Sequence, residues 1–169
     1  GFQEVLRHGG GGVGQTPDRW DNAYFDGSYW HNGKAVKAEG FCTDVFFDYA
    51  TRFIDKVKDE DKPFFVYLCT NAPHGPMHAP KYYGDMYRDL NPKLANFYGM
   101  ITNIDDAVGR LRSHLKTNGL EDDTIFIFTT DNGSSSGART FNDGMRGQKG
   151  SEYDGGHRVP FFVHYPKGG

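Results

Sequence analysis

Two adjacent oxygen donors follow an apolar run in the second half of the chain. The stretch Thr129-Thr130-Asp131-Asn132-Gly133 places a carboxylate beside a neutral amide oxygen. Hard oxygen donors of this kind suit Ca²⁺ or Mg²⁺. An Asn-Gly pair is also typical of a type I′ hairpin turn, although the following Ser-Ser-Ser-Gly is not typical of a returning strand. The pattern alone leaves a metal site and a plain turn equally open.

A proline-rich loop carries two histidines. The stretch Asn71-Ala72-Pro73-His74-Gly75-Pro76-Met77-His78-Ala79-Pro80 contains three prolines, which stiffen the backbone around His74 and His78. A histidine in a fixed position can bind an anion, ligate a metal or transfer a proton. Taken by itself, however, the stretch is more typical of a surface turn with incidental histidines.

A third polar segment is rich in glycine and cations. It has the sequence Arg-Gly-Gln-Lys-Gly-Ser-Glu-Tyr-Asp-Gly-Gly-His-Arg-Val-Pro, from Arg146 to Pro160. The flanking glycines let the backbone approach a ligand closely, and the Lys149 ammonium can meet an anionic group as a point charge. The alternative is a solvated loop. A phosphate-binding P-loop is not indicated, because the segment lacks the GxxxxGK[ST] spacing.

Two amphipathic helices are predicted near these segments. The first begins at Thr43, which suits an N-cap, and Pro63 ends it. Its apolar stripe repeats every fourth residue, at Val45, Tyr49, Phe53 and Val57. The second helix covers residues 94–115, where apolar side chains keep a helical period, and Gly119 suits the position just after its end.

Three short apolar runs, at residues 64–68, 124–129 and 159–165, predict buried strands. Continuous apolar strands joined by a helical crossover predict an α/β layered domain with parallel pairing. Ligands bind outside the carboxyl ends of the strands in such sheets. Residues 71–80 and 131–136 follow the first two strands directly, so the sequence predicts a site at that edge.

Composition excludes several function classes. The chain has 169 residues with 19 Lys+Arg and 22 Asp+Glu, a net charge of −3, which argues against a dedicated nucleic-acid binder. No apolar run approaches the roughly 18 residues of a membrane span. The chain begins at Gly1 without methionine and ends just after an apolar run, so we expect it to be part of a longer protein.

The remaining residues divide into an N-terminal segment and an α/β core. Residues 1–40 are predicted to be irregular and packed by aromatics, with a turn at 31–34, and residues 41–169 form the core. Three aromatics of the N-terminal segment are interpreted as core residues rather than sugar-stacking residues: Trp20, Tyr24 and Trp30. The two cysteines, Cys42 and Cys69, do not make a disulfide framework, and both are expected in packing roles.

Together these segments resemble the sulfatase family of the alkaline-phosphatase superfamily, over nearly the whole chain. TTDNG resembles its metal-ligand motif, APHGPMHAP its histidine loop and KGSEYDGGHRVP its lysine loop, and the likeness is closest to bacterial glycan-type sulfatases. The resemblance implies an alkaline-phosphatase-like α/β/α layered domain with a central, mostly parallel sheet. Residues 1–169 would be the middle part of that catalytic domain.

The resemblance also implies roles for single residues. Asp131 and Asn132 would bind a divalent cation, Ca²⁺ or Mg²⁺. Lys149 would hold the sulfate and the leaving oxygen, and His74 would contact the sulfate and help protonate the leaving alcohol. The family nucleophile is a formylglycine made in a C/S-x-P-S-R motif. Neither cysteine lies in such a motif, so it is expected upstream of Gly1, and the isolated chain is expected to be inactive.

The function implied is hydrolysis of sulfate esters, of sulfated carbohydrates or aryl sulfates, in the periplasm or outside the cell. Two alternatives stay open. One is a phosphoesterase or phosphotransferase of the same superfamily. The other is a non-catalytic module that binds sulfated glycans or Ca²⁺. The residues of this chain do not identify the natural substrate or the oligomeric state.

Overall fold

The structure, a computed structural model, describes residues 1–9 and 23–168. The chain divides into two units, Gly1–Leu111 and Arg112–Gly169. Trp20 lies outside the described residues. No helix in the described parts of the chain is both long and apolar enough to cross a membrane.

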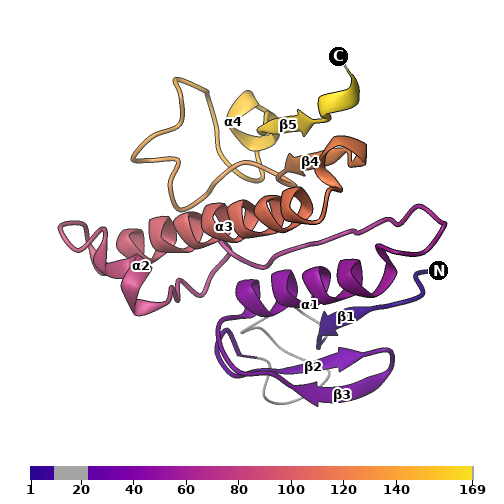
Figure 1. Ribbon diagram of the computed structural model, residues 1–169. Coiled ribbons are helices and arrows are strands. Elements are labelled where there is room, and N and C mark those ends of the chain that lie inside the picture. The colour runs from indigo at the N-terminus through magenta and orange to yellow at the C-terminus, as the bar shows by residue number, and fades with distance from the viewer. Residues whose placement is uncertain (10–22, 169) are drawn as a thin grey trace. The chain divides into compact units, whose positions relative to one another are not determined.

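The first unit opens with a small antiparallel sheet (Figure 1). Its strands are β1 (Leu6–His8), β2 (Ser28–His31) and β3 (Lys34–Lys37), in that spatial order. Asn32 and Gly33 join β2 to β3 with φ angles of 49° and 80°, as a type I′ turn requires. The turn predicted at residues 31–34 is therefore confirmed, but the irregular structure predicted around it is wrong, because strands flank it.

Helix α1 (Cys42–Val57) confirms the first predicted helix but buries a different face. Its buried residues are Cys42, Thr43, Val45, Phe46, Phe47, Ala50 and Ile54. Of the residues in the predicted stripe, only Val45 is buried. Tyr49, Phe53 and Val57 are partly exposed. The difference arises because the core of this unit, including Tyr24, Tyr29 and Phe41, contacts the Phe46 side of the helix.

Helix α3 (Pro92–Thr117) confirms the second predicted helix. Gly119 follows its end with a φ of +69° and donates its N–H to the Lys116 carbonyl at 3.0 Å. Leu120 donates to the Leu115 carbonyl at 2.9 Å, so the two bonds form a Schellman motif. The predicted role of Gly119 is therefore confirmed.

The first part of α3 is bound to α1 by a buried polar contact. The side-chain amide of Asn103, which is fully buried, donates to both carboxylate oxygens of Asp44 at 3.2 Å. The Arg110 guanidinium also donates to Asp44. Because a buried amide needs a partner, this contact specifies how the two helices pack as well as stabilising them.

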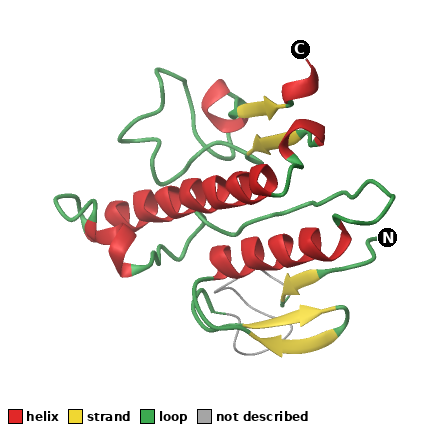
Figure 2. Cartoon of the chain, in the orientation of Figure 1, coloured by secondary structure: helices red, strands yellow, loops and turns green. Residues whose placement is uncertain are grey.

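The segment at residues 64–68 carries no strand, so that prediction is wrong. Figure 2 shows the segment as loop. Its side chains alternate between partly buried and exposed, with Phe65 and Tyr67 each 71 % exposed. The segment thus has the alternating burial that is typical of a strand, but among the described residues no strand pairs with it.

The second unit contains a two-stranded sheet and short helices. Its elements after α3 are η1 (Glu121–Asp123), β4 (Phe126–Thr129), α4 (Asp154–His157), β5 (Phe161–His164) and η2 (Pro166–Gly168). The two strands predicted here are confirmed. Their pairing is antiparallel, with Phe126 opposite His164 and Thr129 opposite Phe161, so the predicted parallel pairing is not found among the described residues. The described residues still contain both helices and strands, as predicted for an α/β domain.

The sheet formed by β4 and β5 is also less buried than predicted. Ile127 is 53 % exposed and Phe161 and Phe162 are more than half exposed, whereas burial on both faces was expected for continuous apolar runs. Apolar composition alone does not distinguish a strand covered on both faces from one covered on a single face.

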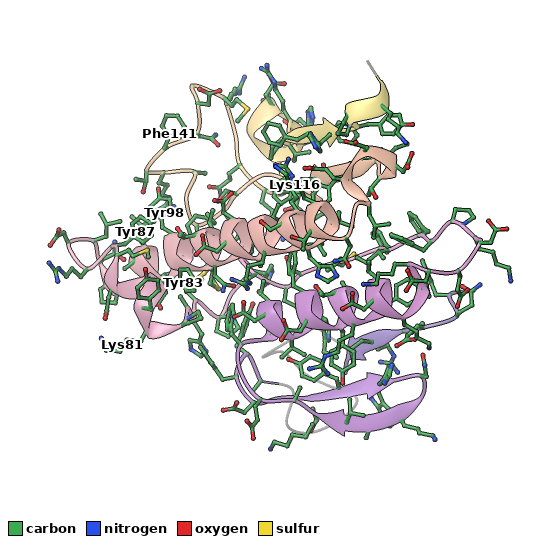
Figure 3. All side chains as sticks on the ribbon, viewed as in Figure 1. Lys81, Tyr83, Tyr87, Tyr98, Lys116 and Phe141 are labelled. Carbon is green, nitrogen blue, oxygen red and sulfur yellow. The ribbon has the colours of Figure 1, made fainter. Side chains whose placement is uncertain are left out.

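Helix α2 (Lys81–Asp85) lies within the loop region that precedes α3. Tyr83 donates its hydroxyl to Asp106 at 3.0 Å, and the hydroxyls of Tyr87 and Thr102 lie 2.7 Å apart. Tyr83 and Tyr87 are labelled in Figure 3. At Gly99 the backbones come close. A Cβ there would lie 2.9 Å from the Gly84 nitrogen and from the Tyr83 carbonyl carbon.

Two glycines of α3 should therefore respond in opposite ways to alanine. Gly109→Ala should raise the free energy of unfolding by about 0.5–1 kcal/mol, because nothing lies within 4 Å of the new Cβ and alanine favours the helix. Gly99→Ala should lower it by about 1–3 kcal/mol, because the new methyl group meets backbone atoms. Urea unfolding followed by circular dichroism measures both. Stabilisation by Gly99→Ala would contradict the close packing.

The two cysteines have different environments. Cys42 is fully buried, as expected, and burial raises the pKa of its thiol to about 12. Cys69 is exposed, so the packing role expected for it is wrong. Both thiols are free.

At pH 8 the Cys42 thiol should remain protonated and covered, because its pKa lies well above that pH. Ellman's reagent should therefore modify one cysteine rapidly in the native chain and both in denaturant. Cys69→Ser should remove the rapid reaction. Rapid modification of native Cys42 would show that the face of α1 it occupies is not packed.

Candidate active site

The Asp131–Asn132 turn begins two residues after the end of β4. Asp131 is exposed and accepts a hydrogen bond from the side-chain amide of Asn132. Among the described residues, left-handed φ angles occur elsewhere, and neither Asn132 nor Gly133 has one. Residues 134–137 form no strand. A type I′ hairpin is therefore excluded at this position, which leaves the two oxygen donors at an open turn.

A close backbone crossing joins this turn to α4. The Gly133 N–H donates to the Gly156 carbonyl at 2.9 Å. A Cβ on Gly133 would lie 1.9 Å from the Gly155 oxygen, and one on Gly156 would lie 2.1 Å from the Ser151 oxygen. No side chain fits at such distances, so the crossing requires glycine at both positions.

The Lys149 loop reaches the same turn through its backbone. The Lys149 N–H donates to the Ser134 carbonyl at 3.2 Å, two residues beyond Asn132. Ser151 closes the loop, since its N–H donates to the Gln148 carbonyl at 2.9 Å and its hydroxyl accepts from the Gln148 N–H at 3.1 Å. The structure therefore brings the backbone of Lys149 beside the turn that carries Asp131 and Asn132, and the lysine is exposed.

Arg146 and Tyr153 border this loop on either side. The Arg146 guanidinium lies 3.6 Å from the centre of the Tyr153 ring, a close cation–π contact. The Arg146 carbonyl accepts the Gly155 N–H at 2.8 Å. The sequence gives no signal for this contact of Tyr153 with Arg146, because the contact depends on the loop returning on itself.

The His74 loop belongs to the first unit and packs on its core. Ala72 is buried, and the peptide bonds before Pro73 and Pro76 are cis. The His74 N–H donates to the Asn71 carbonyl at 2.8 Å, and Nδ1 of the ring lies 2.9 Å from the Gly75 carbonyl oxygen. Because a carbonyl oxygen only accepts, the proton of this contact lies on Nδ1.

Tyr24 contacts this loop from the core of the first unit. It is 2 % exposed, as expected for a core aromatic, and its hydroxyl donates to the His74 carbonyl at 2.6 Å. Burial raises the pKa of the Tyr24 phenol, so it stays a neutral donor. This contact has no signal in the sequence, because the two residues are 50 positions apart. Trp30 of the same group is only partly buried.

The donor set near Lys149 suits a hard divalent cation but is small. Asp131 and Asn132 offer a carboxylate and an amide oxygen, which are typical ligands of Ca²⁺ and Mg²⁺. In the described parts of the chain, no group of three or more His, Cys, Asp or Glu side chains is placed to hold a metal. A cation at this turn would therefore need further ligands from elsewhere. His74 lies in the other unit.

Comparison with known proteins identifies the class. The family model for sulfatases matches residues 1–169, so the chain belongs to the sulfatase family. The uncharacterized sulfatase YdeN of Escherichia coli is 35 % identical over 145 residues. An ulvan-active sulfatase of Formosa agariphila is 33 % identical over 134 residues. These matches cover 83 % and 69 % of this chain but 26 % of each relative, so the chain spans about a quarter of their length.

Solved structures agree with this membership. Ps i-CgsB, solved in complex with k-i-k-neocarrahexaose, has a TM-score of 0.77 and 37 % identity over 83 % of this chain and 31 % of its own. The PsFucS1 sulfatase from Pseudoalteromonas sp. has a TM-score of 0.64 and 26 % identity over 83 % of this chain and 30 % of its own.

The crossing at Gly133 can be tested by substitution. Gly133→Ala should open the loop around Lys149, because the methyl group would overlap the Gly155 carbonyl. Tryptic cleavage after Arg146 and Lys149 should then accelerate at least about fivefold, the size expected for an overpacking cost of 1–3 kcal/mol. Mass spectrometry of the cleavage products measures this rate.

Ser135→Ala is the matched control, since Ser135 is small, exposed and lies in the same turn. Its cleavage rates should equal those of the unmodified chain. Equal rates in Gly133→Ala would contradict the crossing.

Proposed function

We propose that this chain is part of an enzyme that hydrolyses sulfate esters of carbohydrates. The observation that carries the proposal is the placement of the Lys149 loop beside the Asp131–Asn132 turn through glycine crossings. Family membership supports the reaction. The substrate class is supported by relatives named as an ulvan-active sulfatase and an N-acetylgalactosamine-6-sulfatase.

The proposed roles follow from where charge develops. A sulfate ester spreads negative charge over several oxygens as its bond to the alcohol breaks. The Lys149 ammonium would offset the charge on the sulfate and on the departing oxygen. His74, protonated on both ring nitrogens, would give the Nε2 proton to the leaving alcohol, while its Nδ1–H stays bound to the Gly75 carbonyl and keeps the ring oriented.

Two further groups complete the proposal. Asp131 and Asn132 would hold a divalent cation, Ca²⁺ or Mg²⁺, which when bound offsets charge on the sulfate oxygens. The formylglycine nucleophile would lie elsewhere in the protein, because neither Cys42 nor Cys69 stands in the required motif. The isolated chain should accordingly be inactive. The periplasm or the cell exterior is the proposed compartment.

The test uses the full-length protein, co-expressed with a formylglycine-generating system, with an aryl sulfate and the matched aryl phosphate as substrates. Lys149→Ala should lower kcat/KM for the sulfate by about 100–1,000-fold, the usual cost of removing one group that stabilises developing charge. Lys116→Ala, an exposed lysine of α3, is the control and should leave the rate unchanged (Figure 3).

Other outcomes point to the alternatives. Preference for the phosphate would place the protein among the phosphoesterases. Turnover that survives a chelator would contradict the cation site at Asp131. Absence of turnover with aryl sulfates and with sulfated oligosaccharides would favour a module that only binds sulfated glycans.

A further inference from the structure

We propose that Asn142 is a positioning residue for Lys149, an assignment whose catalytic part rests on the proposed function. The nitrogen of the Asn142 side-chain amide donates to the Met145 carbonyl at 2.9 Å and to the Gly147 carbonyl at 2.8 Å. One amide therefore binds both carbonyls that flank Arg146. Nothing in the sequence motifs singled out Asn142.

The chemistry of this contact requires an amide. The two carbonyl oxygens can only accept, and the Asn142 nitrogen carries two N–H groups, one for each. An aspartate has nearly the same shape but would set an oxygen against both carbonyls. An alanine would leave both carbonyls without this partner. The contact is therefore specific for a donor and not only for the volume of the side chain.

The surrounding backbone closes on the Asn142 amide. A Cβ on Gly155 would lie 2.6 Å from the Asn142 nitrogen and 2.3 Å from the Gly147 oxygen. Gly155 also donates its N–H to the Arg146 carbonyl at 2.8 Å. Three consecutive carbonyls, at residues 145–147, are thus bound by one side chain and one neighbouring N–H, which fixes the path of the chain at this point.

That path leads directly to Lys149. Gly147, bound by Asn142, lies two residues before Lys149, and the Lys149 N–H binds the Ser134 carbonyl beside the Asp131–Asn132 turn. The segment that carries the lysine is therefore fixed on one side by Asn142 and on the other by the turn. Asn142 has its effect through the backbone of this loop, and the ammonium of Lys149 is the group that it places.

The first test is a double-mutant cycle in the full-length protein. Asn142→Ala and Asn142→Asp should each lower kcat for an aryl sulfate by about 100-fold, as expected for a displacement near 1 Å of a charge-stabilising group. KM should change by less than about threefold. In a Lys149→Ala background, either substitution should cost less than about threefold, because the residue through which Asn142 acts is already gone.

The control is Asn118→Ala, which removes a side-chain amide that donates to the His114 carbonyl at 2.8 Å, outside the loop. It should leave kcat unchanged in both backgrounds. An undiminished loss from Asn142→Ala in the Lys149→Ala background would overturn the assignment, because Asn142 would then act independently of Lys149.

A second readout does not need activity. Amide hydrogen exchange should accelerate in peptides covering residues 146–151 of Asn142→Ala, and stay unchanged there in Asn118→Ala. A different result is that the unmodified protein hydrolyses no sulfate ester while Asn142→Ala still exchanges faster. That result would overturn the proposed function but support the binding of the loop backbone by Asn142. Unchanged exchange in Asn142→Ala would overturn the Asn142 assignment, whatever the activity.

Discussion

The backbone crossing at Gly133 is the constraint on which the candidate site depends. The turn that carries Asp131 and Asn132 reaches the Lys149 loop only because Gly133 has no Cβ, which would lie 1.9 Å from the Gly155 oxygen. A hydrogen bond of 2.9 Å from Gly133 to Gly156 then joins the two segments. Backbone groups therefore determine how closely the turn that carries the oxygen donors approaches the loop that carries the lysine.

The His74 loop is positioned by different physics. Its carbonyl accepts a hydrogen bond from Tyr24, a residue 2 % exposed within an apolar core that also includes Ala72 and Met100. Burial excludes water from that bond and makes its loss costly. The histidine is thus held by a packed core, whereas the lysine is held by a loop that binds its own backbone. A substitution that loosens the core around Tyr24 should therefore displace His74 more than Lys149.

The parts of the fold that were predictable are those whose signal is local. Helix α3 and its cap at Gly119 follow from a 3.6-residue period and a glycine at the right place. The pairing of β4 with β5 was not predictable, since apolar runs do not encode the direction of a partner 35 residues away. Residues 64–68 are likewise an apolar run whose composition did not reveal that it pairs with no strand among the described residues. The hairpin at Asn32-Gly33 carried a local signal for the flanking strands, because an Asn-Gly pair is typical of a type I′ hairpin and aromatic residues such as Tyr29 and Trp30 favour strands.

The candidate site divides in the same way. Asp131, Asn132 and Lys149 could be proposed as candidates from residue type, because oxygen donors suit a hard cation and an ammonium suits an anion, but the pattern alone left a plain turn and a solvated loop open. Asn142 could not be proposed in this way, because its role exists only once residues 145–147 turn toward it. The glycines are also explained by two different causes. Gly150 has a left-handed φ angle and open space around it, whereas Gly133 is required by the close approach of the Gly155 carbonyl, and Gly147 combines a left-handed φ angle with a close neighbour, the Ser151 hydroxyl. A count of glycines predicts unusual backbone but not which of these two causes applies, and close approach at Gly133 is the cause that lets the backbone of the Asp131–Asn132 turn meet that of the Lys149 loop.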